Sequence, residues 1–401
     1  MGGHPDRGAT LNGDALAFRD AVAIGVAAPA PAFALAATLG LVVATAGAHA
    51  PAVLLLAAVP MLCIAIAFAE LNRVDPDCGT AYSWSRRELG PAVGFAGGWA
   101  IVVASVVVLG ILVNTAALYL LLLLGIDGAT VTATALGALM LVAVTAFSVR
   151  GVELSGRASR LLVALQLVAL VLLAVVALAN ADAGSPQLSW FSPFALDGDA
   201  LLDALIVAIF LYWGWDCAVF VAEETRDGAH AAGRAGIAAV GVLVAIYVLV
   251  ITALLAHGGT ALGDLDATAA DVLGSPLDKL VVLAVCLSSL ASAQVTVLAQ
   301  ARTMLAMARN RDLPGRLAHI HARERTPDRA TLWAGALGLT WYVSFTAISD
   351  DVLADSLLAT GLFVVFVHAL VGVACVARFR HALRSSPRAF VLMGVLPLTG
   401  A

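Results

Sequence analysis

Long uncharged stretches separated by short polar segments dominate this chain. A helix needs roughly 20 apolar residues to cross about 30 Å of hydrocarbon, so each long stretch predicts one membrane-spanning helix. Ten stretches qualify: residues 21–48, 51–69, 91–126, 128–149, 161–181, 200–223, 235–257, 280–301, 330–349 and 356–377. An eleventh begins after Arg388, but its residues up to Ala401 would cover only about 20 Å as a helix. We therefore expect a partial eleventh helix or a truncated sequence.

The composition agrees with a multi-pass membrane protein. Of the 401 residues, 61% are hydrophobic and 12% charged, whereas soluble domains carry about 25% charged residues. Mean hydropathy is +0.97. This composition argues against a cytosolic enzyme and against a nucleic-acid binder, and it makes the lipid bilayer the expected surroundings. The five cysteines stand singly without a CxxC pair, which predicts neither a disulfide framework nor a metal site.

Motifs of membrane enzymes are missing from the sequence. An ATP-driven pump needs a GxxxxGK[ST] loop, but the only lysine, Lys279, follows an aspartate. A membrane-embedded hydrolase needs a second catalytic acid or an HExxH pair in a span, and neither occurs. We therefore predict that the protein is not an enzyme and needs no cofactor.

Arginines gather in alternate loops, beginning with the N-terminal segment. Arg86 and Arg87 follow the second stretch, and Arg150 follows the fourth. The intervening loops carry acids such as Asp197 and Asp264 and no arginine. Because basic residues favour the cytoplasmic side, this distribution predicts a cytoplasmic N-terminus in a protein of the plasma membrane.

The first stretch contains an interruption. As one straight helix, residues 21–48 would be about 42 Å long, well beyond the membrane thickness. Pro29 and Pro31 lie in its middle, in the string AIGVAAPAPAF, and they remove helix hydrogen bonds there. This pattern predicts a discontinuous helix. The competing interpretation is a simple proline kink, which packed helix bundles tolerate.

The sixth stretch is interrupted by charge. Its centre reads FLYWGWDCAVFVAEE, from Phe210 to Glu224, and Asp216 is the only acid deep in any span. An ionised carboxylate there costs about 2.5 to 3.5 kcal/mol on insertion scales, so it indicates a functional site. The alternative is a structural aspartate that accepts hydrogen bonds from backbone amides or a neighbouring hydroxyl.

The interrupted stretches are the first and the sixth, which places them at matching positions of two five-helix units. Five is odd, so the second unit must enter the membrane from the opposite side. Discontinuous segments at matching positions of inverted halves point to the binding site of a transporter. We predict a cytoplasmic N-terminal tail over residues 1–16, a first repeat over 17–181, a second over 200–377, and a cytoplasmic loop with the truncated helix 11 over 378–401.

Three segments resemble the amino acid/polyamine/organocation (APC) superfamily of permeases. They are AFAELNRVDPDCGTAYSWSRRELGPAVGFAGGW (Ala67 to Trp99), the aromatic-Gly-aromatic-acid pattern of the sixth stretch with its Glu-Glu pair, and QARTMLAMARNRDLPGRLAHIH (Gln300 to His321). The resemblance implies an all-α integral membrane fold of two inverted five-helix repeats, LeuT-like, with discontinuous helices 1 and 6. It also implies a carrier that works by alternating access.

The resemblance places the substrate between helices 1 and 6. Family members often have a Gly-Ser-Gly-like stretch in helix 1, whereas this chain has Ala27-Ala28-Pro29-Ala30-Pro31, with backbone donors expected at Ala28, Ala30 and Ala32. The expected substrate-binding residues are Ala27, Ala28, Ala30, Phe210, Trp213, Gly214 and Asp216. Trp213 and Phe210 lie about one helical turn apart, so we prefer Trp213 over Trp215 for the site.

Polar residues on other helices suggest coupling and gating. Asp216 could carry a coupled proton, and Ser288, Ser289 and Ser292 could help to bind sodium. The alternative is that these small residues only let helices approach closely. Glu223 and Glu224 are expected to pair with arginines such as Arg302 as an inner gate, or else to form a solvated charged rim.

The isolated Gln166 and His368 are each expected to hydrogen-bond to a neighbouring helix. Taken together, the patterns predict a secondary-active permease for an amino acid or related organic amine, coupled to protons or working as an exchanger. The alternatives are a sodium-coupled symporter of the same fold and a channel.

Overall fold

The computed structural model describes residues 10–126, 128–181, 184–260, 264–346, 348 and 352–401, with only the helical backbone for 352–359. Residues 1–9 of the predicted N-terminal tail lie outside the described residues. The helices of the first half are α1 (Phe18–Ala27), α2 (Pro31–Ala46), α3 (Ala50–Val74), α4 (Ala81–Leu89), α5 (Pro91–Leu124), α6 (Thr130–Ser148) and α7 (Val152–Ala179). Those of the second half are α8 (Gly198–Tyr212), α9 (Cys217–Phe220), α10 (Gly228–Gly258), α11 (Leu265–Leu273), α12 (Asp278–Arg309), α13 (Asp328–Thr346) and α14 (Val352–Phe379). The chain closes with α15 (Pro387–Phe390), a π-helical turn (Val391–Val395) and α16 (Leu396–Thr399).

Each of the ten predicted stretches contains a helix. Eight helical segments among the described residues are long and apolar enough to cross a membrane, and one of them, Phe18–Val74, covers both the first and the second stretch. Helix α13 is not among the eight, yet it packs on α5, α6 and α12 as a member of the bundle. The protein is therefore a multi-pass membrane protein.

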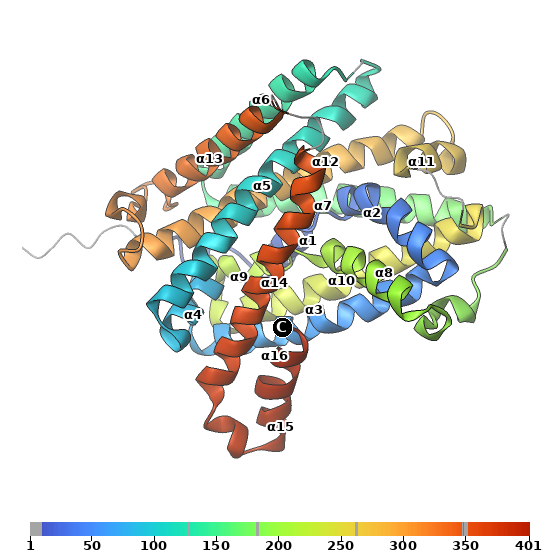
Figure 1. The fold of residues 1–401 in the computed structure, drawn as a ribbon. Helices are drawn as coiled ribbons and strands as arrows, with labels where there is room; N and C mark the ends of the chain where they lie inside the picture. The colour runs from blue at the N-terminus through green and yellow to red at the C-terminus, as the bar shows by residue number, and fades with distance from the viewer. Residues whose placement is uncertain (1–9, 127, 182–183, 261–263, 347, 349–351) are drawn as a thin grey trace, which may run out of the picture.

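Matching helices of the two halves pack against each other. Helix α3 lies on α10, α5 on α12, α6 on α13, and α2 on α8. Figure 1 shows α6 beside α13 at one edge and α3 beside α10 in the body of the bundle. This pairing is what a pseudo-two-fold axis between inverted repeats produces.

Both predicted interruptions are present. Between α1 and α2, Ala30 adopts left-handed φ and ψ of 51° and 68°, and Pro31 then opens α2. Proline fits that first helical position because it needs no N–H partner there. The left-handed residue makes this a break of the helix and excludes the simple kink. Between α8 and α9, Trp213 is extended and Gly214 has a φ of 110°.

Several helices begin or end beyond the predicted limits. Helix α7 begins at Val152, nine residues before the predicted stretch, and α12 continues to Arg309. Arginines at these ends can lay their apolar stems on the bundle while the charge stays in water. The segments predicted as loops also contain α4 and α11, which are short helices outside the spans.

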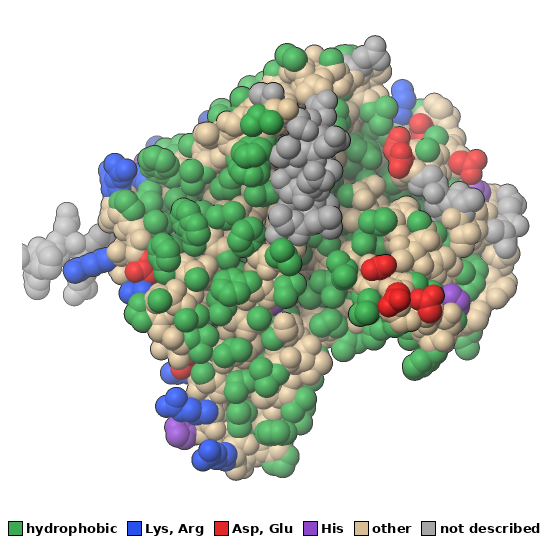
Figure 2. Space-filling view, in the orientation of Figure 1, with side chains coloured by type: hydrophobic (Ala, Val, Ile, Leu, Met, Phe, Trp, Pro, Cys, Tyr) green, Lys and Arg blue, Asp and Glu red, His purple; other side chains and the backbone are tan. Residues whose placement is uncertain are grey.

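The surface separates into an apolar middle and two charged ends. Figure 2 shows hydrophobic side chains over most of the visible face, with basic side chains toward the end that carries α4, and acidic ones toward α11. We call the first end the arginine-rich end. A long apolar surface between two polar ends is suited to a bilayer.

The thirteen-residue helical segment Pro387–Thr399 packs beside α3 and α14, as expected for a partial eleventh helix. A Cβ atom on Gly400 would lie only 2.6 Å from the Pro60 carbonyl oxygen, so glycine permits this close approach to α3.

Candidate functional site

A cavity lies where the two helix breaks meet. Ala28 and Pro29 contribute from the first break, and Trp213, Gly214 and Asp216 from the second. A Cβ atom on Gly214 would lie 3.1 Å from the Ala28 carbonyl carbon and from the Pro29 nitrogen. Glycine is therefore needed at this position both for its positive φ and for the contact between the breaks.

Helices outside the breaks complete the wall of the cavity. Helix α5 contributes the stripe Ile101, Ala104, Ser105, Val108 and Leu112. Helix α12 contributes Ser292, Thr296 and Ala299, and α14 contributes Phe363, Val364, Val367 and His368. The residues enclose about 810 Å³ of space not filled by atoms, including the part that opens to solvent. A mostly apolar wall with a few polar groups is typical of a site for a small organic molecule.

Asp216 is the only acidic side chain among the lining residues, which include no lysine or arginine. It is 7% exposed, and no hydrogen bond from another described residue reaches its carboxylate. Because the surrounding wall is largely apolar, the ionised carboxylate has little to compensate for its lost hydration. A positively charged group in the cavity would supply that compensation.

The backbone of the first break offers few donors for an anion. The Ala28 N–H donates to the Ile24 carbonyl at 3.1 Å, and the Ala30 N–H donates to the Ala27 carbonyl at 3.1 Å. Two of the three predicted N–H donors therefore bind nearby backbone carbonyls and are not free for a substrate. Pro29 and Pro31 have no N–H. Ala32, in the first turn of α2, is the third.

The two tryptophans of the second break lie in different surroundings. Trp213 lines the cavity next to Phe210, with ring centroids 6.1 Å apart. Trp215 is fully buried, and its ring lies 5.2 Å from Phe68 and against Gly236. The structure therefore places Trp213 on the cavity wall and Trp215 in the core behind it.

The three serines of α12 also differ in their hydrogen-bond partners. Ser288 donates to Gln166 of α7, and Ser289 donates to the Val285 carbonyl of its own helix at 2.9 Å. Ser292 alone turns to the break of helix 1, where it donates to the Ala28 carbonyl. Ser288 and Ser289 do not line the cavity, whereas Ser292 does. Gln166 bonds to a neighbouring helix as expected.

A buried ion pair lies at the arginine-rich end. The Nη2 atom of Arg302 lies 2.5 Å from Oε2 of Glu224, and the two side chains are 3% and 0% exposed. Glu223 pairs with Arg309 at 3.0 Å in a more exposed position. The predicted ion pairs are confirmed, and burial of the first excludes a solvated rim there. Burial raises the pKa of Glu224, although the Arg302 guanidinium acts in the opposite direction.

The N-terminal segment is bound over this pair. Leu16 donates to the Glu224 carbonyl at 2.9 Å and accepts from the Arg226 N–H at 2.9 Å, in a parallel bridge with Thr225. Arg325 donates to the carbonyls of Thr10 and Leu11. The chain before α1 thus lies against residues 224–226, just after α9.

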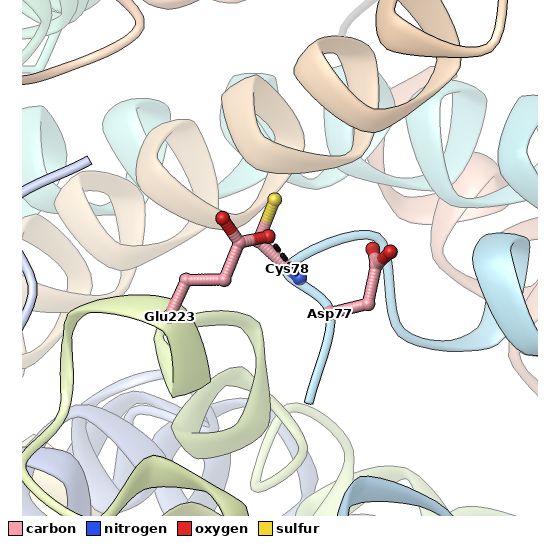
Figure 3. Close-up of side chains that lie close together, drawn as sticks. All are labelled: Asp77, Cys78 and Glu223. Carbon is pink, nitrogen blue, oxygen red and sulfur yellow. Dashed lines mark hydrogen bonds between the residues drawn. The ribbon is translucent and has the colours of Figure 1, made fainter. Parts of the chain in front are cut away.

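Asp77, Cys78 and Glu223 form a cluster in which one potential ligand atom of each lies within 4.8 Å of the others (Figure 3). The Cys78 N–H donates to Glu223 at 2.9 Å, and Arg309 also donates to Glu223. Asp77 accepts from Ser83 at 2.6 Å and from Arg87. Burial, followed by the Glu223 charge, raises the pKa of the Cys78 thiol well above its usual value. Both carboxylates of the cluster already accept hydrogen bonds, and its thiol is protonated. The cluster is therefore better explained as an anchor of the α3–α4 loop than as a metal site.

Of the predicted substrate-binding residues, the structure brings Ala28, Phe210, Trp213, Gly214 and Asp216 to the cavity. Ala27 and Ala30 are buried beside the break without lining it. Sequence reasoning missed the walls from α5 and α14, and it expected His368 to bond to a neighbouring helix. No hydrogen bond joins His368 to any described residue, so that expectation is wrong within the described part of the chain.

The chain is similar in sequence to bacterial transporters. An uncharacterized transporter of Mycobacterium tuberculosis is 30% identical over 291 residues, which are 71% of this chain and 63% of the relative. The chain thus spans about 63% of the length of that relative. The low-affinity putrescine importer PlaP of Escherichia coli is 26% identical over 324 residues, 77% of this chain and 69% of the importer.

Among solved structures, that of MhsT in complex with L-phenylalanine matches with a TM-score of 0.63 at 17% identity, over 94% of this chain and 96% of MhsT. This match shows the fold, two inverted five-helix repeats with interrupted first helices. The model of the amino acid permease family matches residues 22–400, which confirms the resemblance to the APC superfamily. The chain therefore belongs to the amino acid permease family.

Proposed function

We propose that the protein is a secondary-active permease that moves an amino acid or a related organic amine across the plasma membrane by alternating access. The observation that carries the proposal is Asp216, an isolated carboxylate on a cavity between two helix breaks. An ammonium group is the substrate feature that such a carboxylate binds, and Phe210 and Trp213 add aromatic faces that attract a cation.

The relatives support this choice of substrate class. One is named as a putrescine importer, and the solved structure of the shared fold holds L-phenylalanine. Both compounds carry an amine on an apolar skeleton. The wall of the cavity is largely apolar and contains no lysine or arginine, so the amine is the part of the substrate that this chain recognises by charge.

Coupling to protons, or exchange of substrates, agrees with the cavity better than sodium coupling does. Asp216 is a titratable group at the substrate site, so it can link proton binding to substrate binding. A sodium site beside helix 1 would need hydroxyl and carbonyl oxygens. Ser288 and Ser289 are tied to other partners, and only Ser292 approaches the Ala28 carbonyl. That single contact keeps sodium symport as the second candidate.

Orientation and domain boundaries are part of the proposal. The arginine-rich end faces the cytoplasm, the repeats span 17–181 and 200–377, and Glu223 and Glu224 act there as the inner gate. A cysteine introduced at the exposed Gly184 should react with an impermeant thiol reagent added to intact cells, and one at the exposed Gly315 should not. The five native cysteines are buried and give a low background. The reverse labelling pattern would overturn the orientation.

The transport proposal is tested by uptake into proteoliposomes. Labelled amino acids, polyamines and carboxylates without an amine are offered under separately imposed proton and sodium gradients. We expect uptake of amine-bearing compounds under a proton gradient or by exchange, near-complete loss in Asp216→Asn, and partial activity in Asp216→Glu. Asp203→Asn, which changes an exposed acid of α8, is the matched control and should transport like the wild type. Wild-type uptake by Asp216→Asn would refute the assigned role.

A further inference from the structure

His368 is the one imidazole among the polar groups of the cavity wall that have no hydrogen-bond partner in the described part of the chain. It is 3% exposed and lines the cavity together with Phe363, Val364 and Val367. Residues four apart share one face of a helix, so Val364 and His368 present the same face of α14 as Phe363 and Val367 do. The contribution of His368 to the cavity wall follows from this register.

Neighbouring aromatic rings hold the imidazole in place. The ring centroids of Phe68 and Trp215 each lie 6.1 Å from that of His368. These contacts are made by ring faces and edges, and none of the described residues forms a hydrogen bond with the ring. A buried imidazole carries one donor and one acceptor in its neutral form, and leaving both unused is unfavourable. The aromatic contacts therefore position His368 without satisfying it.

Ser105 of α5 and Thr296 of α12 also line the cavity, and their hydroxyls form no hydrogen bond with another described residue. Two further polar side chains of α12 and α7 differ. Ser292 is used by the Ala28 carbonyl, and Gln166 accepts from Ser288 although it does not line the cavity. Within the cavity, the Asp216 carboxylate is suited to bind a positively charged group. The imidazole of His368, on a different helix, can donate one hydrogen bond and accept another. Asp216 and His368 line the same cavity, and Trp215, which directly precedes Asp216 in the chain, contacts the His368 ring.

We propose that His368 binds an uncharged hydrogen-bonding group of the substrate while Asp216 binds its ammonium group. The permease would then select amines that carry a second polar but uncharged group, such as a hydroxyl, on an apolar skeleton. This inference rests on the proposed function, because it takes the cavity as the substrate site. It adds a specificity-determining residue on α14 and narrows the substrate class.

The test uses pairs of amines that differ in one terminal group. Propylamine and ethanolamine form one pair, and pentylamine and 4-amino-1-butanol form the other; within each pair a methyl replaces a hydroxyl. Binding to the purified full chain in detergent is read from the shift of the unfolding temperature with ligand concentration. In the wild type we expect the hydroxyl compound of each pair to bind about threefold to tenfold more tightly, the effect of one neutral hydrogen bond.

Two substitutions of the histidine separate binding from packing. His368→Phe keeps an aromatic ring against Phe68 and Trp215 but loses both polar atoms, and it should reduce the ratio within each pair to about one. His368→Gln keeps a donor and an acceptor and should restore part of the preference. Phe366→Leu, on the exposed face of the same helix and outside the cavity, is the control and should keep the wild-type ratio.

Failures of the two proposals can be told apart. If His368→Phe keeps the hydroxyl preference, or if the wild type prefers the methyl compounds, the role of His368 is overturned while amine binding stands. If Asp216→Asn binds every amine as the wild type does, or if no amine shifts the wild-type unfolding temperature, the proposed function itself is overturned and this inference with it.

Discussion

Two buried carboxylates, Asp216 and Glu224, differ in what surrounds them. Glu224 has no exposed surface and lies 2.5 Å from the Arg302 guanidinium. Asp216 is nearly as buried, yet it has no partner from another described residue and lines a cavity. Burial alone therefore does not distinguish a structural acid from a binding acid. The charge on Glu224 is compensated inside the protein, whereas no described residue compensates the charge on Asp216, as the proposed binding of an ammonium group requires.

The comparison predicts a large stability effect at Glu224 and its partner. Arg302→Ala should lower the free energy of unfolding by about 3–5 kcal/mol, because it leaves the Glu224 charge buried and unpaired. The unfolding temperature of the solubilised protein measures this loss. The double variant Glu224→Leu, Arg302→Leu removes both charges and should recover most of it. If Arg302→Ala melts like the wild type, the pair does not stabilise the arginine-rich end.

The two tryptophans extend the comparison to aromatic side chains. Trp215→Ala should destabilise the protein by about 3–5 kcal/mol, as truncation of a fully buried large side chain does. Trp213→Ala should leave protein levels normal and instead raise the apparent KM or uncouple transport, because Trp213 lines the cavity. Equal thermal stability of both variants would contradict this division. Unchanged transport kinetics in Trp213→Ala would remove Trp213 from the site.

Removing the unpaired charge should have a small effect on stability. Asp216→Asn should raise the free energy of unfolding by no more than about 1 kcal/mol, because binding sites keep uncompensated charged groups at the expense of stability. Thermal unfolding without substrate measures this change. A loss as large as that of Arg302→Ala would mean that Asp216 has an internal partner and that the contrast with Glu224 is false.

The sequence predicted the parts of the site that have a local signal. Pro29 and Pro31 remove N–H groups, and the string around Gly214 places an acid in an apolar helix, so both breaks could be located. The choice between Trp213 and Trp215 followed from helix spacing. Each of these features depends on residues that are close together in the chain, so each can be predicted from a single sequence.

The remaining walls had no such signal. Every span is apolar on all sides, so periodicity cannot tell the face of α5 or α14 that lines the cavity from the faces that meet lipid or other helices. Whether Ser288 or Ser292 approaches Ala28 depends on the rotation of α12, which packing sets. An isolated polar residue in a span usually bonds to a neighbouring helix, so the sequence favoured that role for His368. Its lack of a partner depends on which helices surround it, and the sequence does not show this.

The smallest predicted effect concerns the exposed ion pair next to the buried one. Glu223 and Arg309 are 24% and 36% exposed, so solvent and salt screen their attraction. Arg309→Gln should therefore cost no more than about 1 kcal/mol of unfolding free energy, and less at high salt. Measuring the unfolding temperature of Arg309→Gln and Arg302→Ala over a series of salt concentrations compares the two pairs directly. We expect the Arg309 effect to fade with salt and the Arg302 effect to persist, because burial shields the Glu224 pair from ions. If both fade alike, the buried pair is open to solvent, and internal charge compensation does not explain the difference between Glu224 and Asp216.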